Sequence, residues 1–194
     1  MNTTFFLLLS TILPLCSPYF YIRSILKGDA KPHRTTRFVY LIIGLLTTSS
    51  LLVSGNTVAL AISSVSLLQS IALFILSFRY GVGGWEKTSI ICFILALIGV
   101  AAWQMTSNPI IGLYAGILAD FAGSIPTIRK TIVDPRSEEP RFYAIDAVAG
   151  FFNILALPTL SFQAASYPLY LFGINGLITV LALRSKNSRI HSNN

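Results

Sequence analysis

The sequence predicts an all-α integral membrane protein with seven transmembrane helices, from its composition, its apolar runs and the placement of its basic residues. The chain has 194 residues, of which 54% are hydrophobic and 11% are charged, and its mean hydropathy is +0.70. Soluble domains carry roughly 25% charged residues, so most of this surface is not expected to face water. At about 20 residues per crossing, the length accommodates six or seven crossings and no separate soluble domain.

Seven runs without lysine or arginine are long enough, or nearly so, to cross a bilayer. In hydrocarbon each backbone group needs a partner within its own segment, so these runs are predicted as helices rather than strands. Arg23 and Lys27 follow the first run instead of preceding it, which favours a first span with its N-terminus outside over a cleaved signal peptide. The runs are residues 3–22, 38–55, 57–78, 88–106, 109–128, 142–163 and 167–183.

The basic residues sort to one side of the predicted membrane. All fourteen lysines and arginines lie after the first, third and fifth runs and in the C-terminal tail. The connections near 56, 107–108 and 164–166 carry none. The positive-inside rule therefore places the N-terminus outside and the C-terminus in the cytoplasm. The net charge of +7 is then a topology signal with attraction to anionic lipid, and no nucleic-acid partner is expected.

The cysteines and histidines predict no disulfide, metal site or cofactor site. Cys16 and Cys92 lie inside apolar runs, where a thiol behaves as a small hydrophobic group. His33 and His191 lie in polar segments without the spacing of metal ligands.

An internal repeat relates the two ends of the chain. A shift of 106 residues places Ile22-Arg23 on Ile128-Arg129 and superposes the first three runs on the last three. The run 88–106 is left as a linker, and this odd span makes the halves parallel repeats, with a solute site expected near the midplane between them. The predicted domains are a first three-helix repeat at 1–80, a linker helix at 81–108, and a second three-helix repeat at 109–194 that includes a short basic cytoplasmic tail.

Two proline-containing segments occupy similar places in this 3+1+3 arrangement. They are Ser17-Pro18-Tyr19-Phe20-Tyr21-Ile22-Arg23 and Ile125-Pro126-Thr127-Ile128-Arg129-Lys130. With the N-terminus outside and a proline near the cytoplasmic end of the first helix of each triplet, the chain resembles the SWEET sugar transporters and their PQ-loop relatives over nearly its whole length. The resemblance implies two triple-helix bundles, transport by alternating access, and solute contact through the third helix of each triplet, where Gln69 and Asn175 lie.

Neutral polar side chains within the runs are the candidate solute-binding residues. Gln69 and Asn175 are related by the repeat shift, as two groups lining one cavity would be. Thr47 and Asn153 form a second pair at the same shift. In hydrocarbon each of these side chains needs hydrogen-bond partners, so interhelical hydrogen bonding is the alternative for both pairs.

Two aspartates are the only charged residues within the runs, and we consider both for proton coupling or gating. An ionisable group at depth costs about 2.5–3.5 kcal/mol on insertion scales and usually faces a cavity or a partner. Asp120 follows Gly112 and Gly116 at four-residue steps, so it is expected to point into the bundle. Asp146 lies near the start of its run, which predicts a gating or structural residue close to the headgroups.

Pro18 and Pro126 each remove a backbone donor, and we predict both as hinges of a rocking transporter. The mixed-charge loop 134–140 is predicted as a connector. A cytoplasmic gate that pairs Glu138 or Glu139 with arginines is the alternative.

The function expected from these features is transport of a small polar solute, such as a sugar, an amino acid or a vitamin-like molecule, with proton coupling left open. A receptor or sorting protein of the same fold, which binds a ligand without moving it, is the alternative. No lysine lies in 167–183, which excludes a retinal Schiff base, and no catalytic motif predicts an enzyme. We expect a bacterial plasma membrane, no cofactor, and a chain that is sufficient as a monomer, with homo-oligomers left open.

Overall fold

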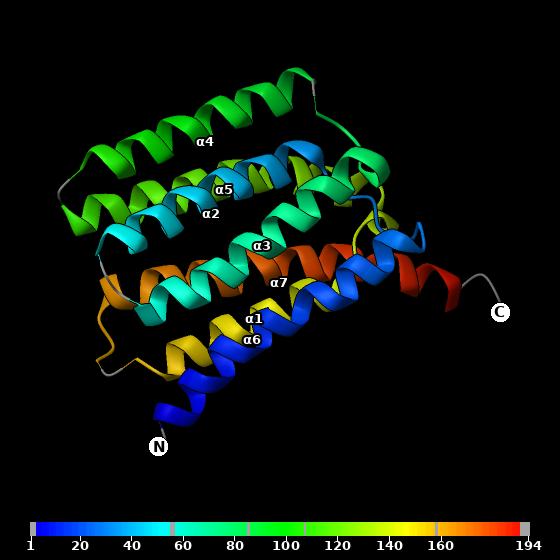
Figure 1. The fold of residues 1–194 in the computed structure, drawn as a ribbon. Helices are drawn as coiled ribbons and strands as arrows, with labels where there is room; N and C mark the ends of the chain where they lie inside the picture. Colours follow the sequence, from blue (N-terminus) through cyan, green and yellow to red (C-terminus); the bar gives the residue numbers. More distant parts are fainter. Residues whose placement is uncertain (1–2, 55–56, 85, 107, 158, 191–194) are drawn as a thin grey trace. The chain divides into compact units, whose positions relative to one another are not determined.

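The computed structural model describes residues 3–54, 57–84, 86–106, 108–157 and 159–190 (Figure 1). Across these residues the chain is all-helical, with seven α-helices and one 3-10 turn, which confirms the predicted number of helices. His191, which the sequence analysis assigns to a polar segment, lies outside the described residues. The elements are α1 Thr3–Leu26, α2 Arg34–Ser54, α3 Thr57–Tyr80, α4 Lys87–Met105, α5 Pro109–Val133, η1 Pro135–Ser137, α6 Pro140–Leu155 and α7 Phe162–Ile190.

Three segments of the described helices are long and apolar enough to cross a membrane: Thr3–Leu26, Ile110–Val133 and Phe162–Arg184. Ser64–Tyr80 and Lys87–Ala102 are shorter apolar helices. These segments indicate a membrane protein. The seven-span topology with an outside N-terminus and the 3+1+3 arrangement stay predictions.

The helices bury small hydroxyl groups and expose large apolar ones. Ser77, Ser124 and Thr131 are fully buried, whereas Leu52 and Leu68 are each 66% exposed. Water-soluble proteins usually show the reverse pattern. Small residues at helix contacts and aliphatic side chains outside them are typical of helices that pack in lipid, which agrees with the apolar segments above.

The predicted span at 142–163 was wrong at its C-terminal end, because α6 ends at Leu155 and α7 already begins at Phe162. Leu157 precedes a proline, which disfavours helical dihedrals at that position. The new helix starts at Ser161, whose Oγ accepts a hydrogen bond from the Ala164 N–H at 3.2 Å. At 1.5 Å per residue, the 16 residues of α6 reach about 24 Å, less than the roughly 30 Å of a hydrocarbon core.

The chain divides into two compact units. Unit 1 contains the residues up to Ala30 and those from Ile128 onward, and therefore α1, η1, α6, α7 and the end of α5. Unit 2 is Lys31–Thr127, with α2, α3, α4 and most of α5. These units do not follow the predicted domains 1–80, 81–108 and 109–194, which describe the sequence repeat and stay a prediction.

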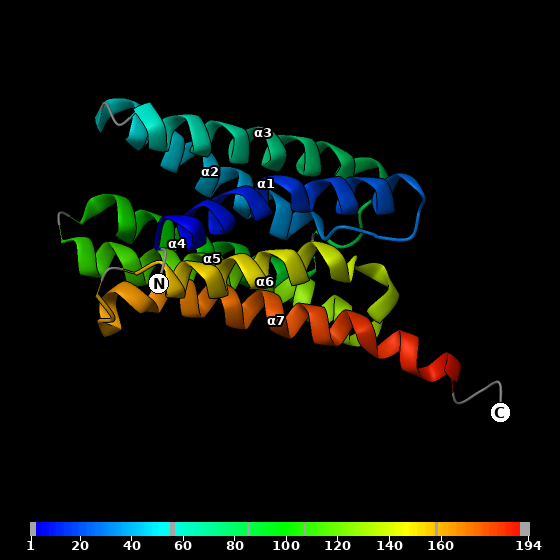
Figure 2. The ribbon, with the colours of Figure 1, turned by 90° about the horizontal axis from the view of Figure 1, so that it is seen from below.

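In unit 1, α1 packs against α6, and α6 packs against α7 (Figures 1 and 2). The ring of Tyr21 stacks on Phe142 with centroids 4.8 Å apart, and the ring of Phe6 stacks on Phe152 at 5.8 Å. Because Tyr21 comes late in α1 and Phe142 early in α6, the two helices are antiparallel. On the other face of α6, a Cβ added to Gly150 would lie 2.9 Å from the backbone nitrogen of Phe172, so the absent side chain allows α7 to approach closely.

In unit 2, α2 is the central element. Val39 on α2, Ala96 on α4 and Ala122 on α5 form a buried apolar cluster. The ring of Phe38 stacks on Phe74 of α3 at 5.2 Å and on Phe93 of α4 at 5.4 Å. Small residues at the α2, α4 and α5 contacts and aromatic rings at the α3 side thus hold three helices around α2.

Candidate functional site

The candidate residues divide evenly between the two units. Each pair related by the repeat shift has one member in each unit, and all six polar candidates are half-buried. Unit 2 holds Thr47, Gln69, Asp120 and Pro126, and unit 1 holds Pro18, Asp146, Asn153 and Asn175. Their roles in solute binding, coupling and bending stay predictions.

Asn153 and Asn175 keep unused hydrogen-bonding capacity within the described residues. The Asn175 Nδ2 group donates to the Leu171 carbonyl of the same helix at 2.9 Å, which leaves its Oδ1 and second N–H for another partner. The Asn153 side chain makes no hydrogen bond within the described ranges. An amide in an apolar helix that uses so little of its capacity can bind a polar molecule that reaches it.

A polar seam joins α2 to α5 in unit 2. The Thr127 hydroxyl donates to the Thr36 Oγ1 at 2.9 Å, and the hydroxyls of Tyr40 and Ser124 lie 2.7 Å apart. Ser124 also donates to the Asp120 carbonyl at 2.8 Å. The residues on α5 therefore recur at one face of the helix.

The seam also gives the relative direction of the two helices. Thr36 pairs with Thr127 and Tyr40 with Ser124, so residue numbers rise along α2 as they fall along α5. The two helices are therefore antiparallel along the seam. A Cβ added to Gly116, two turns before Ser124, would meet no atom within 4 Å, so the space beside that turn of α5 is open.

The two predicted hinge prolines are both buried. Pro18 lies inside α1, entirely in unit 1. Pro126 lies inside α5, one residue before the chain passes from unit 2 to unit 1 between Thr127 and Ile128. Among the described helices, α5 alone has residues in both units.

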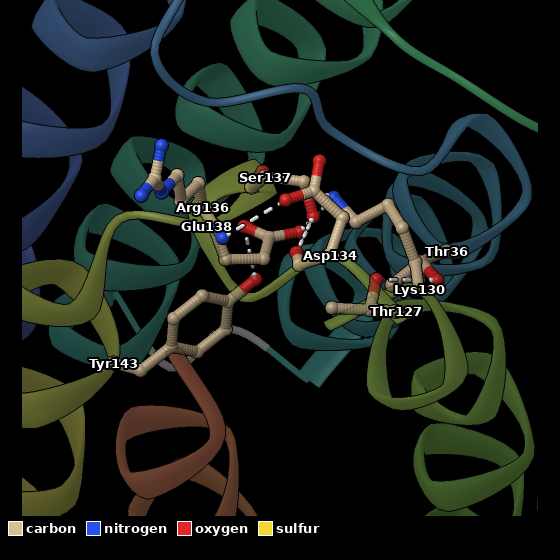
Figure 3. A network of polar contacts seen from close by, with 8 residues as sticks. All are labelled: Thr36, Thr127, Lys130, Asp134, Arg136, Ser137, Glu138 and Tyr143. Carbon is tan, nitrogen blue, oxygen red and sulfur yellow. Dashed lines mark hydrogen bonds and ion pairs between the residues drawn. The ribbon is translucent and has the colours of Figure 1, made fainter. Parts of the chain in front are cut away.

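A buried ion-pair cluster lies where α5 leads into α6 (Figure 3). The Lys130 Nζ lies 2.6 Å from the Glu138 Oε1, with side chains 10% and 0% exposed. The Tyr143 hydroxyl donates to the Glu138 Oε2 at 3.0 Å. Lys130 also donates to the Ser137 carbonyl at 3.2 Å. Both carboxylate oxygens of Glu138 thus have a partner, one on α5 and one on α6.

Local sequence explains how Glu138 comes to point inward. Asp134 directly follows α5, and its side chain accepts a hydrogen bond from the Arg136 N–H at 3.1 Å. Pro135 then starts the 3-10 turn. On the other side, the Glu139 side chain accepts from the Arg141 N–H at 3.2 Å, and a proline starts α6. Two capped turns therefore fix the backbone on either side of Glu138.

The prediction of the 134–140 loop as only a connector missed this cluster. The alternative, a gate pairing Glu138 with arginine, named the carboxylate but not its partner, which is Lys130. The Arg141 side chain is 68% exposed, and its Nε lies 3.9 Å from Glu139. Lys130 and Glu138 are separated by a loop, so no helical spacing in the sequence signals their contact.

A second polar cluster lies in unit 2, where the connection from α1 to α2 meets the end of α3. The Arg34 guanidinium donates to the carbonyls of Ser77 at 3.1 Å, Phe78 at 3.4 Å and Gly83 at 3.1 Å. The first two are carbonyls of the last turn of α3, where a cation is favourable, and the Ser77 carbonyl also accepts from the Gly81 N–H at 2.9 Å. Gly83 has a φ of +70° and packs against the ring of His33, so a side chain fits there neither in conformation nor in space. This cluster has the character of a helix cap.

Among the described residues, no group of three or more histidine, cysteine, aspartate or glutamate side chains is arranged to hold a metal ion. Comparisons with protein-family models, curated proteins and solved structures found no match to the chain. Its function is therefore inferred from its own residues and packing.

Proposed function

We propose that this chain is a membrane transporter that moves a small polar solute by alternating access. The observation that carries the proposal is the division into two compact units that the chain joins at only two places, at residues 30–31 and at 127–128. Alternating access needs two bodies that move against each other. Each unit of this chain carries polar candidate residues within its helices.

The two connections suit relative motion. The first follows Gly28, which ends α1 in a left-handed conformation with φ +80°. The second lies inside α5 beside Pro126, which has no N–H to donate to the Ala122 carbonyl. Proline is a frequent cause of helix kinks, and at the place where the chain changes units it serves as the hinge.

The solute-binding residues in this proposal are Gln69, Asn175, Asn153 and Thr47. The Asn153 and Asn175 amides use little of their hydrogen-bonding capacity, which favours a polar partner. Asp120 and Asp146 are the proton-coupling or gating residues.

For the membrane topology we propose the 3+1+3 repeat with the N-terminus outside and the C-terminus in the cytoplasm of a bacterium, in which the moving bodies are units 1 and 2 rather than the two repeats. The resemblance to the SWEET and PQ-loop proteins and the sorting of the basic residues support it.

The test is uptake into proteoliposomes of a panel of radiolabelled sugars, amino acids and vitamins, with and without a proton gradient. We expect saturable uptake of at least one solute, and its loss in Asn175→Ala. Thr179→Val is the matched control, because the Thr179 hydroxyl is already bonded to a backbone carbonyl one turn away on α7. We expect the Thr179→Val protein to retain uptake. Proton coupling requires that the effect of the gradient disappear in Asp120→Asn.

Two results would contradict the proposal. No uptake of any solute, together with saturable binding, would favour a receptor or sorting protein. Equal uptake by Asn175→Ala and the wild type would remove Asn175 from the site.

A further inference from the structure

The α5 helix is held on both sides of Pro126 by buried polar contacts. In unit 2, Thr127 and Ser124 bond to Thr36 and Tyr40 of α2. In unit 1, one turn after the proline, Lys130 bonds to the Glu138 carboxylate and to the Ser137 carbonyl. The helix bond that Pro126 cannot make would join residues 122 and 126, before the Thr127 contact, so a bend at the proline displaces the end of α5 that carries Lys130.

We propose that the Lys130–Glu138–Tyr143 cluster is a latch that opens and closes with the bending of α5. In the closed state it holds the 134–139 connection against the end of α5 and the start of α6. In the open state the connection leaves α5, and its buried residues reach water. This inference rests on the proposed function for the motion that operates the latch, but its test requires no solute.

An ion pair suits a contact that must be both specific and reversible. Removing two charges from water costs several kcal/mol per ion, and the attraction between them offsets that cost only in good geometry. The closed cluster has that geometry, because both Glu138 oxygens are bonded and the pair is at 2.6 Å. When it opens, water solvates Lys130 and Glu138 and returns the desolvation cost. An apolar contact of the same size has no such compensation on opening.

The latch also reaches α1. The Tyr143 ring meets the ring of Tyr21 at 6.2 Å and that of Phe142 at 4.9 Å. Tyr21 is fully buried and stacks on Phe142. The position of the Tyr143 hydroxyl is thus set by the packing of α1 on α6, so the Glu138 carboxylate closes onto a hydrogen-bond donor that is held in place.

The reporter for the latch is a cysteine at position 137. Ser137 is 3% exposed, lies next to Glu138 in the connection, and is not one of the three latch side chains. The substitution Ser137→Cys is made in a Cys16→Ser, Cys92→Ala background, in protein reconstituted into liposomes. The measurement is the rate of reaction with a membrane-impermeant maleimide, without solute.

We expect slow labelling with the latch intact and labelling about tenfold faster or more in Glu138→Gln and in Lys130→Met, because each loses the ion pair. The exchange Lys130→Glu with Glu138→Lys should restore slow labelling to within about threefold. The matched control is Phe152→Ala, which removes the ring that stacks on Phe6 near the C-terminal end of α6, away from the latch, and lowers the stability of unit 1.

Equal acceleration by Phe152→Ala and Glu138→Gln would overturn the latch, because labelling would then report general loss of stability. Fast labelling with the latch intact would also overturn it. If labelling follows the latch but no solute is transported, the latch stands and the transporter proposal fails. If transport is found and labelling ignores Glu138, the latch alone fails.

Discussion

Two glycines of α5 are predicted to respond in opposite directions to the same substitution. A Cβ added to Gly123 would lie 2.6 Å from the Val39 Cγ1 and 3.1 Å from the Val39 Cβ. Carbon atoms in contact are ordinarily about 3.5–4.0 Å apart, so the shortfall is close to 1 Å. Rotation of Val39 gives no relief, because its own Cβ is already too close and its χ1 is restricted in a helix. A Cβ at Gly116 would meet nothing within 4 Å.

The magnitudes follow from these contacts. Overpacking costs about 1–3 kcal/mol, and separating α2 from α5 weakens the bond between Tyr40 and Ser124, worth about 0.5–1.5 kcal/mol. Alanine returns about 1 kcal/mol of helix propensity at either site. We therefore expect Gly123→Ala to destabilise the protein by about 1–3 kcal/mol and Gly116→Ala to stabilise it by up to about 1 kcal/mol.

The assay is thermal unfolding of both variants in one detergent, followed by tryptophan fluorescence and by circular dichroism. For a chain of this size, 1 kcal/mol shifts Tm by about 2–4 °C, so the two variants should differ by on the order of 10 °C. Equal shifts, or a rise in Tm for Gly123→Ala, would refute the close approach of α2 to α5 at Val39.

Three further substitutions test other contacts by the same unfolding measurement. Arg34→Gln removes the charged donor from the carbonyls that end α3 and should lower the free energy of unfolding by about 1–3 kcal/mol. The control Arg79→Gln, at an exposed position, should change Tm little. Similar losses in the two variants would argue against the cap. Lys130→Met removes the cation from a buried carboxylate and should lower the free energy of unfolding by about 3–5 kcal/mol. Adding Glu138→Gln should recover most of that loss. An additive loss in the double variant would speak against a buried pair. Gly150→Ala brings a Cβ within 2.9 Å of the α7 backbone and should lower Tm, and an unchanged Tm would contradict the close packing of α6 on α7.

The helices were predictable because lipid-facing helices leave a local signal. Most of the apolar runs are bounded by charges or by glycine and proline, and five of the seven predicted starts agree with the structure to within a few residues. The failure lay between α6 and α7, where residues 156–161 are apolar enough to continue a span. Hydropathy does not register that a proline after Leu157 and a capping hydroxyl at Ser161 end one helix and begin the next.

The buried ion-pair cluster could not be predicted from the sequence, because its contacts depend on the path of a loop. In the sequence, Glu138 and the adjacent Glu139 are equally plausible partners for Lys130. In the structure Glu138 is enclosed, whereas Glu139 accepts a backbone hydrogen bond at the start of α6. The two turns on either side decide which carboxylate turns inward, and a sequence pattern does not resolve a rotation of one residue.

The place of Pro126 joins the sequence and the structure most closely. Its prediction as a hinge rested on a helix bond that proline does not make. In the structure, the boundary between the two units falls one residue later, between Thr127 and Ile128. The bond that Pro126 cannot make would join residues 122 and 126, so the weakest turn of α5 lies just before that boundary, on the unit 2 side. Because Thr127 is bonded to Thr36 of α2 and Lys130 to Glu138, the residues that follow this turn are fastened in both units.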